Sequence, residues 1–192
     1  MQSKGLMKRA VFGVATVAAV VFAGAAQAAL QDRDLDGNGF TDTLYDTDLD
    51  ITWLRDANVN GPKYGNDAVS WADGYGFGGY SEWRLPIGDP SCYGGGCPIV
   101  GEMDHLWHVE LGNTYGGGSN PGGFRNLDPD GVYGSGTAYA PGATSGMYFS
   151  MYFGWLGASR DGQYYQFPAT AVRPGDVVAV PAPETYALML AG

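Results

Sequence analysis

Residues 44–54, LYDTDLDITWL, hold the clearest structural pattern in the chain. Leu44-Tyr45 and Ile51-Thr52-Trp53-Leu54 are rich in aromatic and β-branched residues, which favour β-strands. The intervening Asp46-Thr47-Asp48 consists of residues that are common in turns. We therefore predict two short antiparallel strands joined by this turn near the start of the folded domain.

Two helices are predicted further along the chain. The first covers residues 66–73, with Asn66 as its N-cap and Gly74 at its end. The second covers residues 102–111 and ends before Gly112, a natural C-cap. The apolar side chains expected to face the core from these helices are Ala68, Val69, Trp71, Ala72, Met103, Leu106 and Trp107.

The remaining segments suggest loops and short strands. Residues 83–86, Trp-Arg-Leu-Pro, are predicted to be extended because proline cannot continue a helix. Residues 112–146 contain 11 glycines and three prolines, so we expect a loop there. Residues 147–155 are predicted to form an aromatic strand that pairs with residues 163–167 across a turn at 159–162.

A final strand is predicted over residues 171–173 and 176–180, interrupted at Pro174-Gly175. Short strands that alternate with two helices indicate an α+β fold. We therefore predict a single compact domain of short antiparallel strands with two helices.

The first 28 residues carry the features of a secretory signal peptide. Lys4, Lys8 and Arg9 precede an apolar run over residues 10–25, and Ala26-Gln27-Ala28 is a small-x-small cleavage site. The run of about 16 residues is shorter than the ~20 that a membrane-spanning helix needs. We therefore predict cleavage after Ala28 and export of the rest of the chain.

The charge balance limits the possible partners. Three of the ten basic residues lie in the predicted signal peptide, so seven remain against 20 acidic residues. Nucleic acids and anionic membrane surfaces bind proteins that carry a basic patch. We expect no nucleic-acid partner.

Cys92 and Cys97 are the only two cysteines, and Tyr93 and three glycines separate them. Export places both thiols in an oxidising compartment, where a disulfide is expected. Closing so small a loop stabilises a fold by about 2 kcal/mol. The spacing differs from the redox C-x-x-C pattern, so a structural bridge is the favoured interpretation.

Residues 34–42, DLDGNGFTD, match the first part of a calcium-binding loop. Alternate oxygen-bearing side chains on a tight turn converge on one point, and calcium binds six to eight oxygens. Tyr45 stands where such loops place a bidentate glutamate, and Asp46 is a candidate substitute. The alternative is a solvated acidic turn. The predicted ligands of Ca²⁺ are Asp34, Asp36, Asn38, the Phe40 carbonyl and Asp42.

A dense group of aromatic residues occupies positions 148–167. Because alternate residues of a strand face opposite sides, some of these rings are expected in the core and others at the surface. Exposed aromatic rings are suited to stacking on sugars or to protein contacts. The predicted ligand-binding residues are Tyr148, Tyr152, Tyr164 and Tyr165.

Catalytic motifs are missing from the sequence. There is no G-x-S-x-G, H-E-x-x-H or P-loop pattern, so we expect no enzymatic activity. His105 and His108 lie three residues apart on the predicted second helix, a spacing that suits zinc. No third strong ligand stands at a fixed offset, which favours two surface histidines instead.

The C-terminal residues 180–192 resemble the start of a PEP-CTERM sorting tail. Pro181-Ala182-Pro183-Glu184 stands where that family has Pro-Glu-Pro, and about seven apolar residues follow. Either the sequence is truncated at Gly192 or the sorting signal is incomplete. Membership would imply export in a Gram-negative bacterium, processing by an exosortase, and a link to exopolysaccharide or biofilm.

The body of the chain resembles the Lcl C-terminal domain family. The series of matches runs from Tyr45-Asp46-Thr47 and Thr52-Trp53-Leu54 through residues 79–86, GYSEWRLP, to residues 102–106 and 171–174. This resemblance implies an α+β fold similar to C-type lectins, glycan binding in some members, and structural roles for Trp53, Trp71, Trp83 and Arg84. No catalytic residues are implied.

These observations divide the chain into four parts: a signal peptide (1–28), an acidic calcium loop (29–43), an Lcl-like domain (44–178) and a partial sorting tail (179–192). We predict an exported, non-catalytic binding module at the cell surface or in the extracellular matrix. Its expected partner is an extracellular glycan or matrix component. The alternatives are a secreted hydrolase with an unrecognised carboxylate pair and a purely structural matrix protein.

Overall fold

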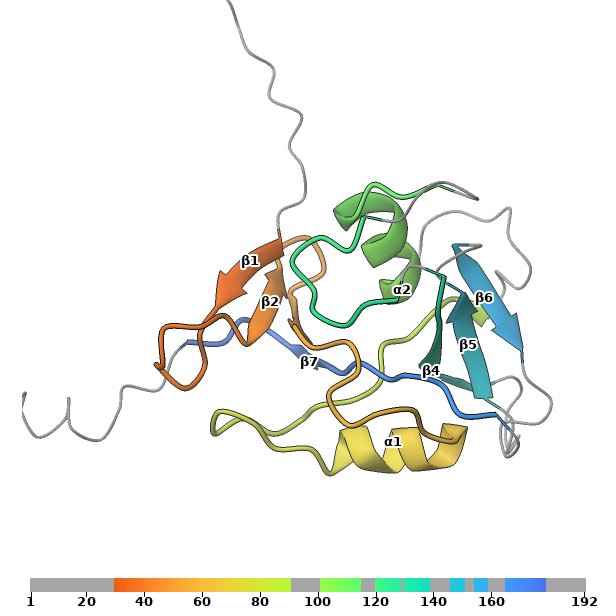
Figure 1. Ribbon diagram of the computed structural model, residues 1–192, viewed down its shortest axis with the longest axis horizontal. Helices are drawn as coiled ribbons and strands as arrows, with labels where there is room; N and C mark the ends of the chain where they lie inside the picture. Colours follow the sequence, from red (N-terminus) through yellow and green to blue (C-terminus); the bar gives the residue numbers. More distant parts are fainter. Residues whose placement is uncertain are drawn as a thin grey trace, which may run out of the picture.

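Two antiparallel sheets and two helical segments form the described part of the chain (Figure 1). The computed structural model describes residues 30–90, 101–114, 120–128, 130–138, 146–150, 154–158 and 165–178. This arrangement confirms the predicted α+β class, whereas the likeness to C-type lectins stays a prediction.

The larger sheet has four strands in the order β1-β2-β3-β7. They are β1 (Leu30–Arg33), β2 (Thr43–Asp46), β3 (Ile51–Leu54) and β7 (Val172–Pro174). The pairing of β2 with β3 confirms the predicted hairpin. The Asp46 carboxylate stabilises its turn, because Oδ1 accepts the backbone N–H groups of Asp48 at 3.1 Å and Leu49 at 3.0 Å.

Every residue of β3 is buried, because the sheet is covered on both faces. Ile51 and Trp53 belong to a core on the side of α2, and Leu54 belongs to a second core on the side of α1. Figure 1 shows α2 and α1 on opposite sides of β7. A central strand covered in this way is apolar on both faces rather than alternating.

Both predicted helices are present, with differences at their ends. Helix α1 covers Gly65–Asp73 and ends at Gly74, as predicted. Its N-cap is Tyr64, so the expectation that Asn66 caps it was wrong. Helix α2 (Glu102–His105) continues directly into a π-helical turn, η2 (Leu106–Glu110), and Gly112 follows with a positive φ of 61°.

The smaller sheet contains β4 (Val132–Ala138), β5 (Gly146–Ser150) and β6 (Trp155–Ala158) in that order. It corrects two predictions. Residues 112–146 are not all loop, and residues 147–155 are not one strand, because β5 pairs with β6. The Phe167 backbone instead pairs with Lys63.

Glycines in β4 explain why that strand was missed. The Gly134 N–H donates to the Pro168 carbonyl at 3.0 Å, and the Gly136 N–H donates to the Pro86 carbonyl at 2.9 Å. A Cβ atom at Gly136 would lie 3.1 Å from the Leu85 carbonyl oxygen. Here glycine permits the close approach of another backbone, rather than marking a loop.

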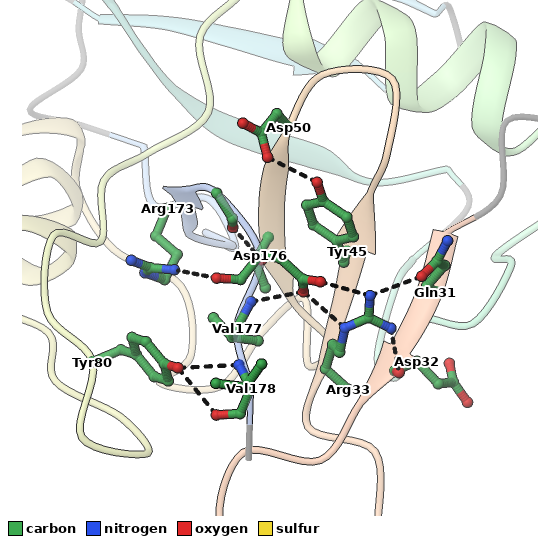
Figure 2. A network of polar contacts seen from close by, with 12 residues as sticks. Gln31, Asp32, Arg33, Tyr45, Asp50, Tyr80, Arg173, Asp176, Val177 and Val178 are labelled. Atoms are coloured by element: carbon green, nitrogen blue, oxygen red, sulfur yellow. Dashed lines mark hydrogen bonds and ion pairs between the residues drawn. The ribbon is translucent and has the colours of Figure 1, made fainter. Parts of the chain in front are cut away.

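A polar network joins β1 to the segment that follows β7 (Figure 2). The Arg33 guanidinium donates to both carboxylate oxygens of Asp176, at 2.7 and 2.8 Å. Hydrogen bonding to Arg33 holds the pKa of Asp176 below its usual value. The Tyr80 hydroxyl contacts the backbone N–H and carbonyl of Val178, both at 3.0 Å. The first strand is thus attached to the end of the described chain.

Candidate functional site

The predicted calcium loop connects β1 to β2. Its ends are held together by the Asp42 N–H, which donates to the Arg33 carbonyl at 2.9 Å. The Leu35 side chain is fully buried in the core beside α1, which fixes the loop to the domain. The loop is therefore part of the larger sheet's edge.

Hydrogen bonds to the backbone organise this loop from within. Asp34 accepts the N–H groups of Gly37 at 2.8 Å and Gly39 at 2.7 Å. Asp36 Oδ1 accepts the Asn38 N–H, and Asn38 Oδ1 accepts the Phe40 N–H. Gly37 and Gly39 have φ angles of 73° and 86°, which L side chains rarely adopt.

Three of the predicted ligands come together. Asp34, Asp36 and Asp42 each offer a carboxylate oxygen, and these oxygens lie within 4.8 Å of one another. Asn38 and Phe40 belong to the same hydrogen-bonded loop, and the Phe40 side chain is 65 % exposed. The residues present thus fit an oxygen-liganded cation such as calcium, with water completing the six to eight ligands.

Neither candidate for the twelfth position joins the group of loop carboxylates. The Tyr45 hydroxyl donates to the Asp50 carboxylate at 2.8 Å (Figure 2). Asp46 is fully buried at the far end of β2 and belongs to a separate group with His105 and Glu110. The expectation that Asp46 completes the calcium site was therefore wrong.

An open cleft lies directly beside the loop. Its volume is about 110 Å³. The acidic loop and residues 54–59 contribute one part of its lining, and the segment after α1 contributes two aromatic rings. The lining residues are Thr41, Asp42, Leu54, Arg55, Asp56, Val59, Tyr75, Phe77 and Arg125.

The cleft combines aromatic rings with charged groups. Tyr75 and Phe77 are stacked, with ring centroids 6.4 Å apart and an interplanar angle of 25°. Burial raises the pKa of Tyr75, so its hydroxyl stays protonated at neutral pH. Arg55 is held by the Gly123 carbonyl at 2.8 Å. Arg125 lines the cleft and is exposed.

The predicted aromatic ligands lie on another part of the surface. Tyr165 is 60 % exposed and stacks on Phe167, and half-buried Tyr148 contacts Phe167 at a centroid distance of 5.3 Å. Tyr152 and Tyr164 lie outside the described residues, as do Cys92 and Cys97 of the predicted disulfide.

These rings connect to the cleft through Lys63. The Lys63 backbone pairs with Phe167, and its ammonium lies 5.0 Å from the centre of the Trp71 ring. Trp71 contacts Tyr75 at 5.3 Å. We call this series the aromatic track; it consists of Tyr165, Phe167, Tyr148, Trp71, Tyr75 and Phe77.

The two histidines do not share a site. His108 Nε2 lies 3.1 Å from the Gly154 carbonyl oxygen, whereas His105 Nε2 lies 3.2 Å from Glu110 Oε1. His105 and His108 therefore do not form the zinc pair that their spacing alone would suit.

Sequence reasoning missed most of the cleft. Arg55, Asp56, Tyr75, Phe77 and Arg125 come from three separate segments, and no fixed spacing relates them. The one available signal was the proximity of the polar pair Arg55-Asp56 to the end of a predicted strand.

Comparison with protein-family models, with the curated proteins and with the solved structures finds no match. Among the described residues, no helix has the length and apolar character needed to cross a membrane. The resemblances to the Lcl and PEP-CTERM families stay predictions.

Proposed function

We propose that this chain is an exported, non-catalytic binding module whose ligand is a carbohydrate, with exopolysaccharide the leading candidate. The observation that carries the proposal is the cleft of about 110 Å³, in which the Tyr75–Phe77 stack faces charged side chains beside the acidic loop. The predicted signal peptide places the module outside the cytoplasm, at the cell surface or in the matrix.

The chemistry of the cleft suits a sugar. A pyranose has apolar C–H faces that pack on aromatic rings and hydroxyl edges that pair with charged groups. Arg125 supplies donors, and the Asp56 carboxylate, already paired with Asn58 and Asn126, supplies an acceptor. The cleft is small, at about 110 Å³, so a longer glycan would continue along the aromatic track.

Glycan binding is tested by affinity electrophoresis and a glycan array, with and without calcium. We expect Phe77→Ala and Tyr165→Ala each to weaken binding about three- to tenfold, the range that one stacked ring contributes. Ile87→Ala is the control, because Ile87 is 47 % exposed and lies outside the track. An array with no bound glycan under either condition would contradict the proposal.

A hydrolase is the second candidate, because Asp42 and Asp56 both line the cleft. Two carboxylates flanking a glycosidic bond can act as acid and base. Shortening of the bound glycan, lost in Asp56→Asn, would favour this candidate. Self-association without glycan binding would favour a structural matrix protein.

Calcium is predicted to stabilise the folded chain through the acidic loop. A ligand that binds only the native state raises the unfolding temperature as its concentration increases. We expect Asp34→Ala to abolish this shift, because Asp34 both offers a ligand and holds Gly37 and Gly39 in place. The measurement is differential scanning calorimetry over a calcium titration. Magnesium is the comparison ion, and no shift at millimolar calcium would refute the site.

A further inference from the structure

A second polar cluster lies on the opposite side of the sheet from α1, against the core beneath α2. Asp46 is the last residue of β2 and is 0 % exposed. His105 is the last residue of α2, and its side chain is 15 % exposed. Glu110 ends η2, and its side chain is 0 % exposed. One ligand atom from each of the three lies within 4.8 Å of the other two.

The π-helical turn creates this cluster. Residues five apart lie about 140° apart around a regular α-helix, at roughly 100° per residue. A π-helical turn is wider and has i→i+5 hydrogen bonds, as the Leu111 N–H bond to the Leu106 carbonyl at 2.9 Å shows, so it brings His105 and Glu110 nearer to one side. Single π-helical turns occur frequently at functional sites.

The cluster contains buried oxygens without partners. Within the described part of the chain, Asp46 Oδ2 and Glu110 Oε2 accept no hydrogen bond. The described arginine and lysine ion pairs involve Asp176, Glu102 and Glu82, not Asp46 or Glu110. Burying two carboxylates without an arginine or lysine partner costs free energy of folding unless another positive charge neutralises them.

We propose that Asp46, His105 and Glu110 bind a divalent transition-metal ion, with zinc as the best fit. Zinc takes imidazole nitrogen and carboxylate oxygen at 2.0–2.2 Å in a tetrahedron, which places its ligand atoms about 3.3 Å apart. His105 Nε2 is already 3.2 Å from Glu110 Oε1 and 3.9 Å from Asp46 Oδ1. An imidazole ligand distinguishes this site from the all-oxygen acidic loop.

The surroundings of the cluster supply the fourth ligand that a tetrahedral zinc ion needs. The Asp48 Oδ2 atom lies 4.0 Å from His105 Nε2, and its side chain is half exposed. Asp48 or a water molecule therefore completes the tetrahedron from the solvent side. The ion would join the β2–β3 turn to the end of the second helix, which are 59 residues apart from Asp46 to His105 in the sequence.

The test is zinc titration of the purified, chelator-treated protein by calorimetry, with the unfolding temperature measured in parallel. We expect saturable binding that raises the unfolding temperature. Glu110→Gln and Asp46→Asn should each weaken binding by at least about tenfold. His108→Gln is the matched control, since it changes a histidine of the same helix outside the cluster.

The metal-free variants provide a second readout. Glu110→Gln removes a buried charge without changing its shape, so its unfolding temperature without zinc should equal or exceed that of the wild type. A site of purely structural hydrogen bonds would instead lose stability in that variant. Three results would overturn the proposal: no zinc binding by the wild type, binding that persists in both carboxamide variants, or binding lost in Asp34→Ala.

Discussion

Replacing Trp53 with alanine is expected to lower the free energy of unfolding by about 3–5 kcal/mol, the range for truncating a buried tryptophan. Trp53 is 0 % exposed at the centre of β3, between Leu44 of β2 and Val172 of β7. Its ring also meets Phe124 edge-to-face, with centroids 6.1 Å apart. The core around it is built from both neighbouring strands, the α2–η2 helix and Phe124, so these elements cannot all move to close the space left by the ring.

Urea denaturation measures this loss, and Trp71→Ala is the control. Trp71 is only partly buried and packs against the core rather than within it. Its truncation should cost about 1–2 kcal/mol, because less apolar area is removed from water. Equal losses in the two variants would mean that burial at β3 does not set the stability of the fold.

The strongest local patterns were sufficient to predict the hairpin and both helices. The hairpin is marked by the turn residues between Leu44 and Ile51, and the helices by the spacing of their apolar residues. Both signals lie within a few residues of one another, so these elements can be predicted without knowing the tertiary contacts. The strand β1 was missed for the opposite reason. Leu30–Arg33 has one apolar residue, and it is held by pairing with β2 and by Asp176, 143 residues away from Arg33.

The site was less predictable than the fold. The acidic loop is local, so its three carboxylates could be named from spacing alone. The cleft joins segments distant in the sequence. The cluster of Asp46, His105 and Glu110 depends on a π-helical turn. Such a turn holds one extra residue, and no distinct hydrophobic period in the sequence marks it. Sequence patterns found the buried face of this helix, since Met103, Leu106 and Trp107 are all buried, but not the approach of Glu110 to His105.

Replacing Arg84 with methionine is expected to destabilise the fold by about 2–3 kcal/mol, because it leaves a largely buried carboxylate without its cation. Arg84 donates to both oxygens of Glu102, at 2.8 and 2.5 Å, and this bond raises the pKa of the guanidinium. The Glu102 side chain is 13 % exposed, whereas that of Arg84 is 36 % exposed. The family resemblance implied a structural role for Arg84, but the sequence did not identify Glu102 as its partner.

The Arg84–Glu102 ion pair connects three parts of the fold. A double-mutant cycle separates its contribution to stability from that of the neighbouring backbone contacts. The Arg84 backbone pairs with Val172 of β7 at 2.9 and 2.8 Å, and Glu102 also accepts the Ile87 N–H at 2.8 Å. In a double-mutant cycle, Glu102→Gln should cost less than Arg84→Met, because the guanidinium is more exposed than the carboxylate and regains water more easily. The double variant should cost less than the sum of the two single changes, since the unpaired carboxylate is gone. Additive losses would show that Arg84 acts through its packing on the backbone, and that the ion pair contributes little to joining β7 to α2.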